Sequence, residues 1–479
     1  MFRRLCSKGI YFYLVTWKES RPLAVQKLRS KAYAILIRRS KTDIDQAYDL
    51  AHDMLEICLL RGGIARISSC AKDLFIRYKQ LGEIDDLNGA IVLNEEALSL
   101  CPPGHRHRST SLNDLAHCLS FRYDRLGGLD DLERAIVLYQ EALSLRLHGH
   151  PSRQMSLINL AVNLFCRYSQ HGGVDDLNEA IVLGREALSL SPPGGPDRSI
   201  PLNNLALHLF SRYYQLGEID CLEEAIVLDR EALSLYPDGH PDRLTPLVKL
   251  ALLLSSRYEQ LGGSADLNEA IVLYREALSL CPDGHPDRLT SLNNLGRHLS
   301  YRYNQLGGSD DLNELIVLDR EALSLHPPDH PHRSMYLNNL AVALCSQYNR
   351  LGGIDYLEEV IMLDREILSL RPHGHPDHST STSNLALHLS YRYKELGEID
   401  DLDKVIVLNR ETLSLDPPGH PDHLASLRNL ALHLSYRYNQ LGGLGDLEEA
   451  IVLNQEALLF LPPGHPDHLV SLNTLNLAP

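Results

Sequence analysis

The chain has 479 residues, and its 46 Lys and Arg against 62 Asp and Glu give a net charge of −16. A hydrophobic content of 44% with 23% charged residues is typical of a folded protein and excludes wholesale disorder. No apolar run reaches the ~18–20 residues that would cross a bilayer, so we expect no membrane span. The acidic balance argues against nucleic acid as a partner. The nine cysteines form no C-x-x-C pair and indicate free thiols in a reducing, cytoplasmic compartment.

The first segment, residues 1–43, is basic. Residues 1–45 hold eleven Lys and Arg against three acidic residues, and an apolar stretch runs from Ile10 to Trp17. A mitochondrial presequence has this composition, and so has a basic N-terminal helix or a poorly ordered start of the chain, so both interpretations stay open. Residues 44–64 are interpreted as a degenerate half-repeat, because their apolar spacing imitates the second helix of the repeat described next.

Residues 65–479 repeat with a period of 45. The dipeptide Arg-Tyr recurs at this interval from Arg77 to Arg437, and Gln347 with Tyr348 is the one exception. No insertion or deletion interrupts about nine copies, and the chain ends at Pro479 inside a partial tenth copy. Self-similarity at a fixed period of this size is typical of repeat architectures.

The copy that begins at His285 predicts helix A of the repeat. Apolar residues at 292, 295, 296, 299, 303 and 306 follow the three- and four-residue steps of one helix face. Pro286 suits the first helical position, and Asp287 complements the positive end of the helix dipole. Gly307 and Gly308 supply the left-handed conformation that ends a helix.

A second helix, helix B, is predicted to start near Asp311, whose spacing to Glu314 is that of a capping box. Apolar residues from Leu312 to Leu325 again follow helical steps, and prolines at 327 and 328 end the pattern. One such pair of antiparallel helices cannot bury its apolar faces alone, so successive pairs must stack. We therefore expect an all-α fold, a right-handed α-solenoid superhelix of about nine repeats.

The residues at this point resemble a known family, the tetratricopeptide repeat (TPR) proteins. The TPR signature positions match Leu292, Leu295, Gly296, Leu299, Leu315, Ala322 and Pro327. The longer 45-residue phrase is similar to arrays that precede caspase-like CHAT peptidase domains in mushroom-forming fungi. Its sequence motif His-Pro-Asp…Leu-Asn-Asn-Leu-Ala resembles, more distantly, the repeats of kinesin light chains. The resemblance covers residues 65–479 and implies a solenoid that binds a protein or peptide partner.

The resemblance also implies a binding groove on the concave face, which helix A lines in TPR proteins. Family members use an Asn before Leu-Ala or Leu-Gly to hold a peptide backbone, and an amide both donates and accepts. A hydrogen bond between neighbouring helices that fixes the stacking is the other interpretation, and both stay open. Tyrosines one helical turn or more further on add aromatic surface. The candidate groove residues are Asn159, Asn204, Lys249, Asn294, Asn339, Asn384, Asn429, Tyr301, Tyr391 and Tyr436, and Asp114 departs from the pattern as Lys249 does.

A histidine precedes Pro in most copies, for example at His240 and His285. Zinc needs its ligands about 2 Å from one ion, and equivalent positions in stacked repeats lie farther apart than that allows. We therefore interpret this histidine ladder as part of the turn that begins helix A, and expect no metal and no cofactor. The Arg of Arg-Tyr is expected to pair with the Asp-Asp that opens helix B, or with the neighbouring repeat.

No nucleotide-binding, hydrolase or metalloprotease motif occurs, and the chemically active residues recur periodically where a catalytic site would be singular. The sequence therefore predicts a non-catalytic scaffold that binds an extended peptide or protein segment. The alternative is the sensor or regulatory arm of a caspase-like CHAT peptidase whose catalytic domain is absent from this chain. A third possibility, a nucleic-acid-binding superhelix, should show salt-sensitive binding.

Overall fold

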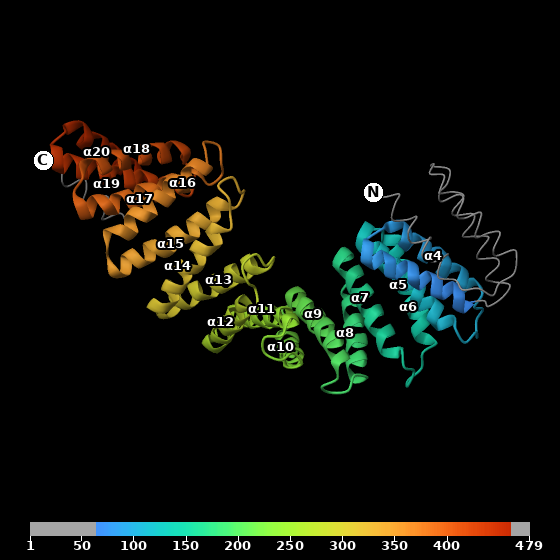
Figure 1. The fold of residues 1–479 in the computed structure, drawn as a ribbon. Helices are drawn as coiled ribbons and strands as arrows, with labels where there is room; N and C mark the ends of the chain where they lie inside the picture. Colours follow the sequence, from blue (N-terminus) through green and yellow to red (C-terminus); the bar gives the residue numbers. More distant parts are fainter. Residues whose placement is uncertain (1–63, 461–479) are drawn as a thin grey trace, which may run out of the picture. The chain divides into compact units, whose positions relative to one another are not determined.

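The computed structural model describes residues 64–460, in which helices and short turns alternate and no strand occurs. The basic segment 1–43, most of the half-repeat 44–64 and the partial tenth repeat lie outside the described residues. The chain divides into two compact units, unit 1 (residues 1–236) and unit 2 (residues 237–479). In each unit the helices form antiparallel pairs that stack in chain order (Figure 1). The predicted all-α helical-repeat fold is thereby confirmed.

Each repeat consists of an A helix and a B helix. The A helices are the helix over residues 64–81, α5 (Arg108–Leu126), α7 (Arg153–His171) and α9 (Ser199–Leu216) in unit 1, and α11 (Leu244–Leu261), α13 (Arg288–Leu306), α15 (Arg333–Leu351), α17 (His378–Leu396) and α19 (His423–Leu441) in unit 2. The B helices are α4 (Ile84–Ser99), α6 (Leu129–Ser144), α8 (Val174–Ser189) and α10 (Ile219–Ser234) in unit 1, and α12 (Ser264–Ser279), α14 (Ser309–Ser324), α16 (Ile354–Leu370), α18 (Ile399–Leu415) and α20 (Leu444–Leu459) in unit 2. Short 3-10 turns, η1 (Pro196–Arg198) and η2 (Pro241–Arg243), precede α9 and α11.

The stop of each A helix is made by a glycine, as the sequence predicts. Gly307 follows α13 with a φ of +67°, and its N–H donates to the carbonyl oxygen of Tyr303 at 2.7 Å. A residue with a Cβ would be strained in this left-handed conformation. The left-handed conformation predicted for Gly308 is wrong, because this residue is extended with φ −68° and ψ 124°. It serves as the N-cap of α14, so only two residues separate the helices of a pair.

The predicted helix starts need correction. α13 begins at Arg288, and Pro286 and Asp287 form a turn before it. This turn is held by His285, whose Nδ1 accepts the Asp287 N–H at 3.1 Å. The residue before Pro is extended where the structure shows it, as at His240 with φ −68° and ψ 132°. The interpretation of the histidine ladder as part of this turn is therefore confirmed.

The predicted capping box is wrong. α14 begins at Ser309 with Gly308 as a cap that has no side chain, so Asp311 lies inside the first turn and caps nothing. The carboxylate of Asp311 instead accepts two hydrogen bonds from the guanidinium of Arg302, at 2.8 and 2.6 Å. Such a two-bond pair between a guanidinium and a carboxylate is charge-assisted and stronger than a neutral hydrogen bond.

The core follows the apolar stripes. Leu292, Leu295 and Leu299 of α13 and Leu312 of α14 are each at most 1% exposed. Every A helix packs against the B helix of its own repeat, and within a unit every B helix also packs against the next A helix. The buried faces thus continue from repeat to repeat, and one repeat covers the apolar surface of the next.

The Arg of Arg-Tyr is expected to pair with helix B or with the neighbouring repeat, and Arg302 contacts both. Arg302 on α13 binds Asp311 on α14, and its Nη1 also donates to Asn268 Oδ1 on the preceding B helix, α12, at 2.8 Å. The repeat of α15 and α16 lacks both members of the Arg–Asp ion pair, because Gln347 replaces the Arg and Tyr356 replaces the Asp. Gln347 keeps the bond to the preceding B helix, donating to Asn313 at 3.0 Å.

The joint replacement of the Arg and the Asp in this repeat predicts how stability changes when the Arg302–Asp311 pair is broken. Arg302→Gln alone is expected to lower the free energy of unfolding by about 1–3 kcal/mol, because Asp311 stays buried without its charged partner. Adding Asp311→Tyr should recover part of that loss by copying the pair of the next repeat. Urea unfolding followed by circular dichroism measures both, with the exposed Arg297→Gln as the control. Equal losses for the single and double variants would contradict the coupling.

Candidate functional site

The A helices lie on the inner side of the stack in unit 1. α7 packs against the preceding and following A helices, α5 and α9, as well as against its neighbouring B helices. Among residues 64–236, no two B helices approach each other as closely. A stack whose A helices are closer together than its B helices is concave on the A side. In unit 1, the predicted groove residues Asn159 and Asn204 lie on these A helices, α7 and α9.

The predicted asparagines begin a stripe on each A helix, which we call the A stripe. It contains the predicted position and the residues three and seven positions later, which share one helix face. On α13 these are Asn294, Arg297 and Tyr301. The first position is half-buried in most repeats and exposed at Asn339 and Asn429. Across the array, the A stripe begins at Asn159, Asn204, Lys249, Asn294, Asn339, Asn384 and Asn429.

The amides of the A stripe make no side-chain hydrogen bond to any residue within 64–460, whereas two asparagines one position earlier in the repeat do. Asn293, one position earlier, donates from Nδ2 to the hydroxyl of Tyr336 on the next A helix at 2.8 Å. Asn113 accepts from Nη1 of Arg146 at 3.1 Å. At Asn113 and Asn293 the preceding position thus bonds to a neighbouring segment, whereas the buried Oδ1 of Asn203 has no partner among the described residues.

The second position of the A stripe is an exposed aliphatic residue in several repeats. The exposed fractions are 41% for Leu207 and Leu252, 58% for Val342 and 44% for Leu387. The sequence analysis does not include these residues, although the repeat carries a signal for them. In the sequence Leu-Ala-Leu-His-Leu, the middle leucine falls outside the buried helical stripe, and the position is Leu or Val in every copy from α5 to α19 except at His117 and Arg297.

The predicted tyrosines stand at the third position of the A stripe and contact other rings. Tyr301 lies 6.2 Å from Tyr258 of the preceding A helix, measured between ring centroids. Tyr391 stacks on Tyr348 at the same distance, and the ammonium of Lys394 lies 5.7 Å from its ring. Tyr436 is 6.4 Å from Tyr393. These half-buried rings form short aromatic ladders between neighbouring A helices.

The A stripe changes character in the first repeats, where Asp114 replaces Asn. Asp114 pairs with Lys72 of the preceding A helix at 3.6 Å, while burial raises the pKa of its carboxyl. His117 and Phe121 follow it on the stripe, with their ring centroids 4.9 Å apart. Burial, assisted by the charge of Lys79, lowers the pKa of His117 to about 4, so this imidazole is neutral at pH 7. This part of the stripe is aromatic and rich in charged groups.

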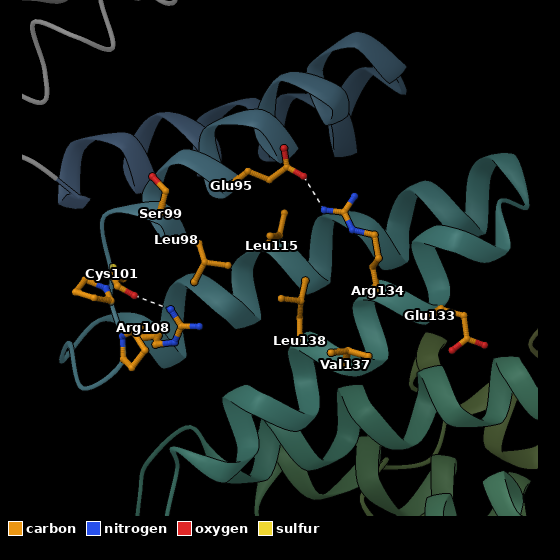
Figure 2. A pocket seen from close by; sticks show the side chains of 12 residues that line it. Glu95, Leu98, Ser99, Cys101, Arg108, Leu115, Glu133, Arg134, Val137 and Leu138 are labelled. Carbon is orange, nitrogen blue, oxygen red and sulfur yellow. Dashed lines mark hydrogen bonds and ion pairs between the residues drawn. The ribbon is translucent and has the colours of Figure 1, made fainter.

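A cleft of about 830 Å³ lies elsewhere, between the successive B helices α4 and α6 (Figure 2). Leu98, Val137 and Leu138 line it, and an ion pair of 2.7 Å between Arg134 and Glu95 spans the two helices. None of the predicted groove residues borders this cleft. It belongs to the B side of the stack.

The stacked A and B helices define the class of the chain as an all-α helical repeat protein built from paired antiparallel helices. No family model matches the sequence, and no curated protein does. Within the part of the chain that the structure describes, no helix combines the length and the apolar character needed to cross a membrane.

Three of the similar solved structures match this chain at less than 25% identity and with TM-scores below 0.5. One is a Podosopora anserina protein described as kinesin light chain nearly identical TPR-like repeats, which shares 22% sequence identity with this chain. Its TM-score is 0.32, and the match covers 46% of this chain and 98% of that chain. Yeast Tom70 is 14% identical with a TM-score of 0.29, covering 86% and 95%. IFIT1 solved with m7Gppp-AAAA is 14% identical with a TM-score of 0.30, covering 86% and 81%. These likenesses carry no argument about function.

Proposed function

We propose that this chain is a non-catalytic scaffold that binds an extended peptide or protein segment along the A stripe. The observation that supports it best is the row of amides on successive A helices of unit 2, whose side chains have no hydrogen-bond partner among residues 64–460. Asn294, Asn339 and Asn384 occupy equivalent positions 45 residues apart, and each can hold a backbone N–H and a backbone C=O together. A ligand that offers such a pair at regular intervals along its length is an extended polypeptide.

The spacing of the helices sets the length of the ligand. Packed helices lie roughly 8–10 Å apart, and an extended chain advances about 3.3 Å per residue, so one repeat spans about three ligand residues. The aliphatic residues of the stripe, such as Val342 and Leu387, then offer an apolar contact once per repeat. The preferred ligand is an extended segment with an apolar side chain at about every third position.

Replacing three amides tests the proposal. Peptides are first selected from a random display library on the full chain, and one is synthesised for titration. The variant Asn294→Ala, Asn339→Ala, Asn384→Ala is expected to bind this peptide at least about tenfold more weakly, because each lost hydrogen bond costs about 0.5–1.5 kcal/mol. Its melting temperature should stay within about 1 °C of the parent, since these side chains bond to no other described residue.

The matched control is Asn293→Ala on the same helix. It removes the hydrogen bond to Tyr336 and is expected to lower stability while leaving peptide affinity unchanged. Peptide binding that survives in the triple variant, or that is lost equally in Asn293→Ala, would assign the ligand to another face.

A protein partner is proposed over nucleic acid because of charge. The chain carries a net −16, and Lys249 is the basic residue among the predicted first positions of the A stripe. Phosphate contacts come mostly from Lys and Arg and make binding strongly salt-dependent. Binding of the selected peptide should therefore change little between 50 and 200 mM salt, whereas a single-stranded oligonucleotide should not bind even at low salt.

The alternative role, the regulatory arm of a caspase-like CHAT peptidase, would use the same face. In that role, occupation of the A stripe would be passed on to a separate or attached catalytic domain. It predicts that a peptide selected on the A stripe changes the activity of a CHAT peptidase encoded with this chain.

A further inference from the structure

The first residue of α17 departs from the pattern of the earlier repeats in a chemically specific way. In α5 this position is Arg108, which donates to the Cys101 carbonyl oxygen at 2.7 Å and to Glu141 at 2.7 Å. In α17 it is His378, whose Nδ1 lies 2.5 Å from the Arg371 carbonyl oxygen and whose Nε2 lies 3.0 Å from Glu411 Oε1. The imidazole thus makes both contacts of the guanidinium. Unlike a guanidinium, it can also bind a metal ion.

A second histidine converges on the same carboxylate. His373, in the turn between α16 and α17, has its Nε2 3.3 Å from Glu411 Oε1, and its ring centroid lies 4.4 Å from that of His378. The three candidate ligand atoms all lie within 4.8 Å of one another. Ligands held about 2.0–2.1 Å from a tetrahedral zinc ion are separated by roughly 3.3 Å, so small side-chain adjustments bring the set to coordination distance.

We propose that His373, His378 and Glu411 form a binding site for one divalent transition-metal ion, with Zn²⁺ as the preferred occupant and water as the fourth ligand. Two imidazoles and one carboxylate are a donor set that zinc accepts in open sites. His378 is already oriented for this role, because its Nδ1–H donates to the Arg371 carbonyl oxygen and leaves Nε2 for the metal. The side chain of His378 is 7% exposed and that of His373 is 75% exposed, so an ion can enter past His373.

The proposal departs from the expectation of no metal, which concerned the histidine ladder. His373 and His378 stand beside the ladder residue His375, whose Nδ1 accepts the Asp377 N–H and holds the turn. The set is therefore local to one repeat and does not require histidines from different repeats to meet.

Within residues 64–460, the other repeats show why this three-residue set occurs once. In the repeat that follows, His423 lies 3.6 Å from Glu456, but Pro418 replaces the second histidine. In the repeat of α7 and α8, His148 is present, but Arg153 occupies the position of His378 and binds Glu186. Two of the three ligands thus occur elsewhere without the third. These repeats supply matched controls within the same chain.

A bound ion would fasten the turn at residues 371–377 and the start of α17 to the last turn of α18. Zinc takes the place of the proton that His378 shares with Glu411, because the metal binds a neutral imidazole. The expected role is structural, since three ligands from one turn and two helix ends would hold a repeat junction closed.

Zinc titration of the full chain by calorimetry tests the site. The parent chain is expected to bind one Zn²⁺ more tightly than its remaining histidines do. His373→Ala should weaken this binding at least about tenfold, whereas His148→Ala should leave it unchanged. Hydrogen–deuterium exchange then locates the ion, because zinc should slow exchange at residues 371–378 in the parent and not in His373→Ala.

A gain-of-site variant completes the test. Pro418→His places a second histidine beside His423 and Glu456 and is expected to add a second bound Zn²⁺, with new protection at residues 416–423. The proposal is overturned if the parent binds no zinc, if His373→Ala binds it as tightly as the parent, or if zinc protects no amide of residues 371–378.

Discussion

Raising the pH from about 6.5 to about 9.5 is expected to destabilise unit 2 by roughly 1–3 kcal/mol through His388. This histidine is buried on α17, and its Nδ1 lies 2.5 Å from Asp364 Oδ2 on α16. Burial alone would lower the pKa of His388, but the hydrogen bond and charge of Asp364, with a contribution from the Cys345 thiol, raise it to about 9.

The direction of the effect follows from proton binding. Between pH 6.5 and 9 the folded chain keeps the proton on His388, whereas an unfolded imidazole releases it. The stabilisation is therefore complete below about pH 6.5 and is lost as the pH rises through 9. Cysteines and lysines also begin to lose protons in this range, so the measurement requires a variant in which only the His388 contribution is changed.

The next repeat provides that variant. Its equivalent pair is His433 with Asn409, at 3.0 Å, and there burial lowers the pKa of the histidine. Asp364→Asn copies this pair into α16 and is expected to abolish the decline in stability between pH 6.5 and 9.5. Urea unfolding of both proteins at three pH values measures it. A decline of the same size in Asp364→Asn would show that His388 is not the group responsible.

The helical framework could be predicted from the sequence because its determinants are local. The glycine at 307 and the apolar steps of α13 act within one or two turns, and a 45-residue period tests each position about nine times. The Arg302–Asp311 pair could be predicted for the same reason, since nine residues separate its members across a tight turn. The starts of the helices could not be predicted in the same way, because the sequence does not show whether Asp311 caps its own helix or pairs with a residue of a neighbouring helix.

The candidate site is harder to predict from the sequence, because it depends on which side chains remain exposed after the helices have packed. An Asn that precedes Leu-Ala looks the same in sequence whether it bonds to the next helix or to a ligand; the structure gives the first role to Asn293 and leaves Asn294 open. The His388–Asp364 pair joins two helices across 24 residues, and only the packing of α16 on α17 brings it together. Comparing repeat positions 24 apart is the one sequence signal that would have found it.

Proline at Ile271 is expected to have a larger effect on stability than any other single change considered above. Ile271 lies in the middle of α12 and is fully buried. Proline there removes a backbone N–H, places its ring against the preceding turn and deletes a packed side chain, which together cost at least about 4 kcal/mol.

The loss is expected to stay local, because in a stack of helix pairs each repeat is stabilised by its neighbours. α12 packs against α11 and α13, so exchange of backbone amides should rise across these three helices. Helices α15 to α20 should keep most of their protection, since each retains its own partner and a following repeat. Hydrogen–deuterium exchange with mass spectrometry resolves the two regions.

Ser264→Pro is the matched control, because Ser264 is the first residue of the same helix, where proline loses no intrahelical hydrogen bond. It should leave the exchange pattern of the parent unchanged. Uniform loss of protection throughout unit 2 in Ile271→Pro would mean that the unit unfolds as a single block, and unchanged protection of α12 would mean that Ile271 contributes nothing to the stack. Loss confined to α11, α12 and α13 is the pattern that nearest-neighbour coupling requires, and it would allow A-stripe residues from Asn339 onward to be tested without interference from the repeats before them.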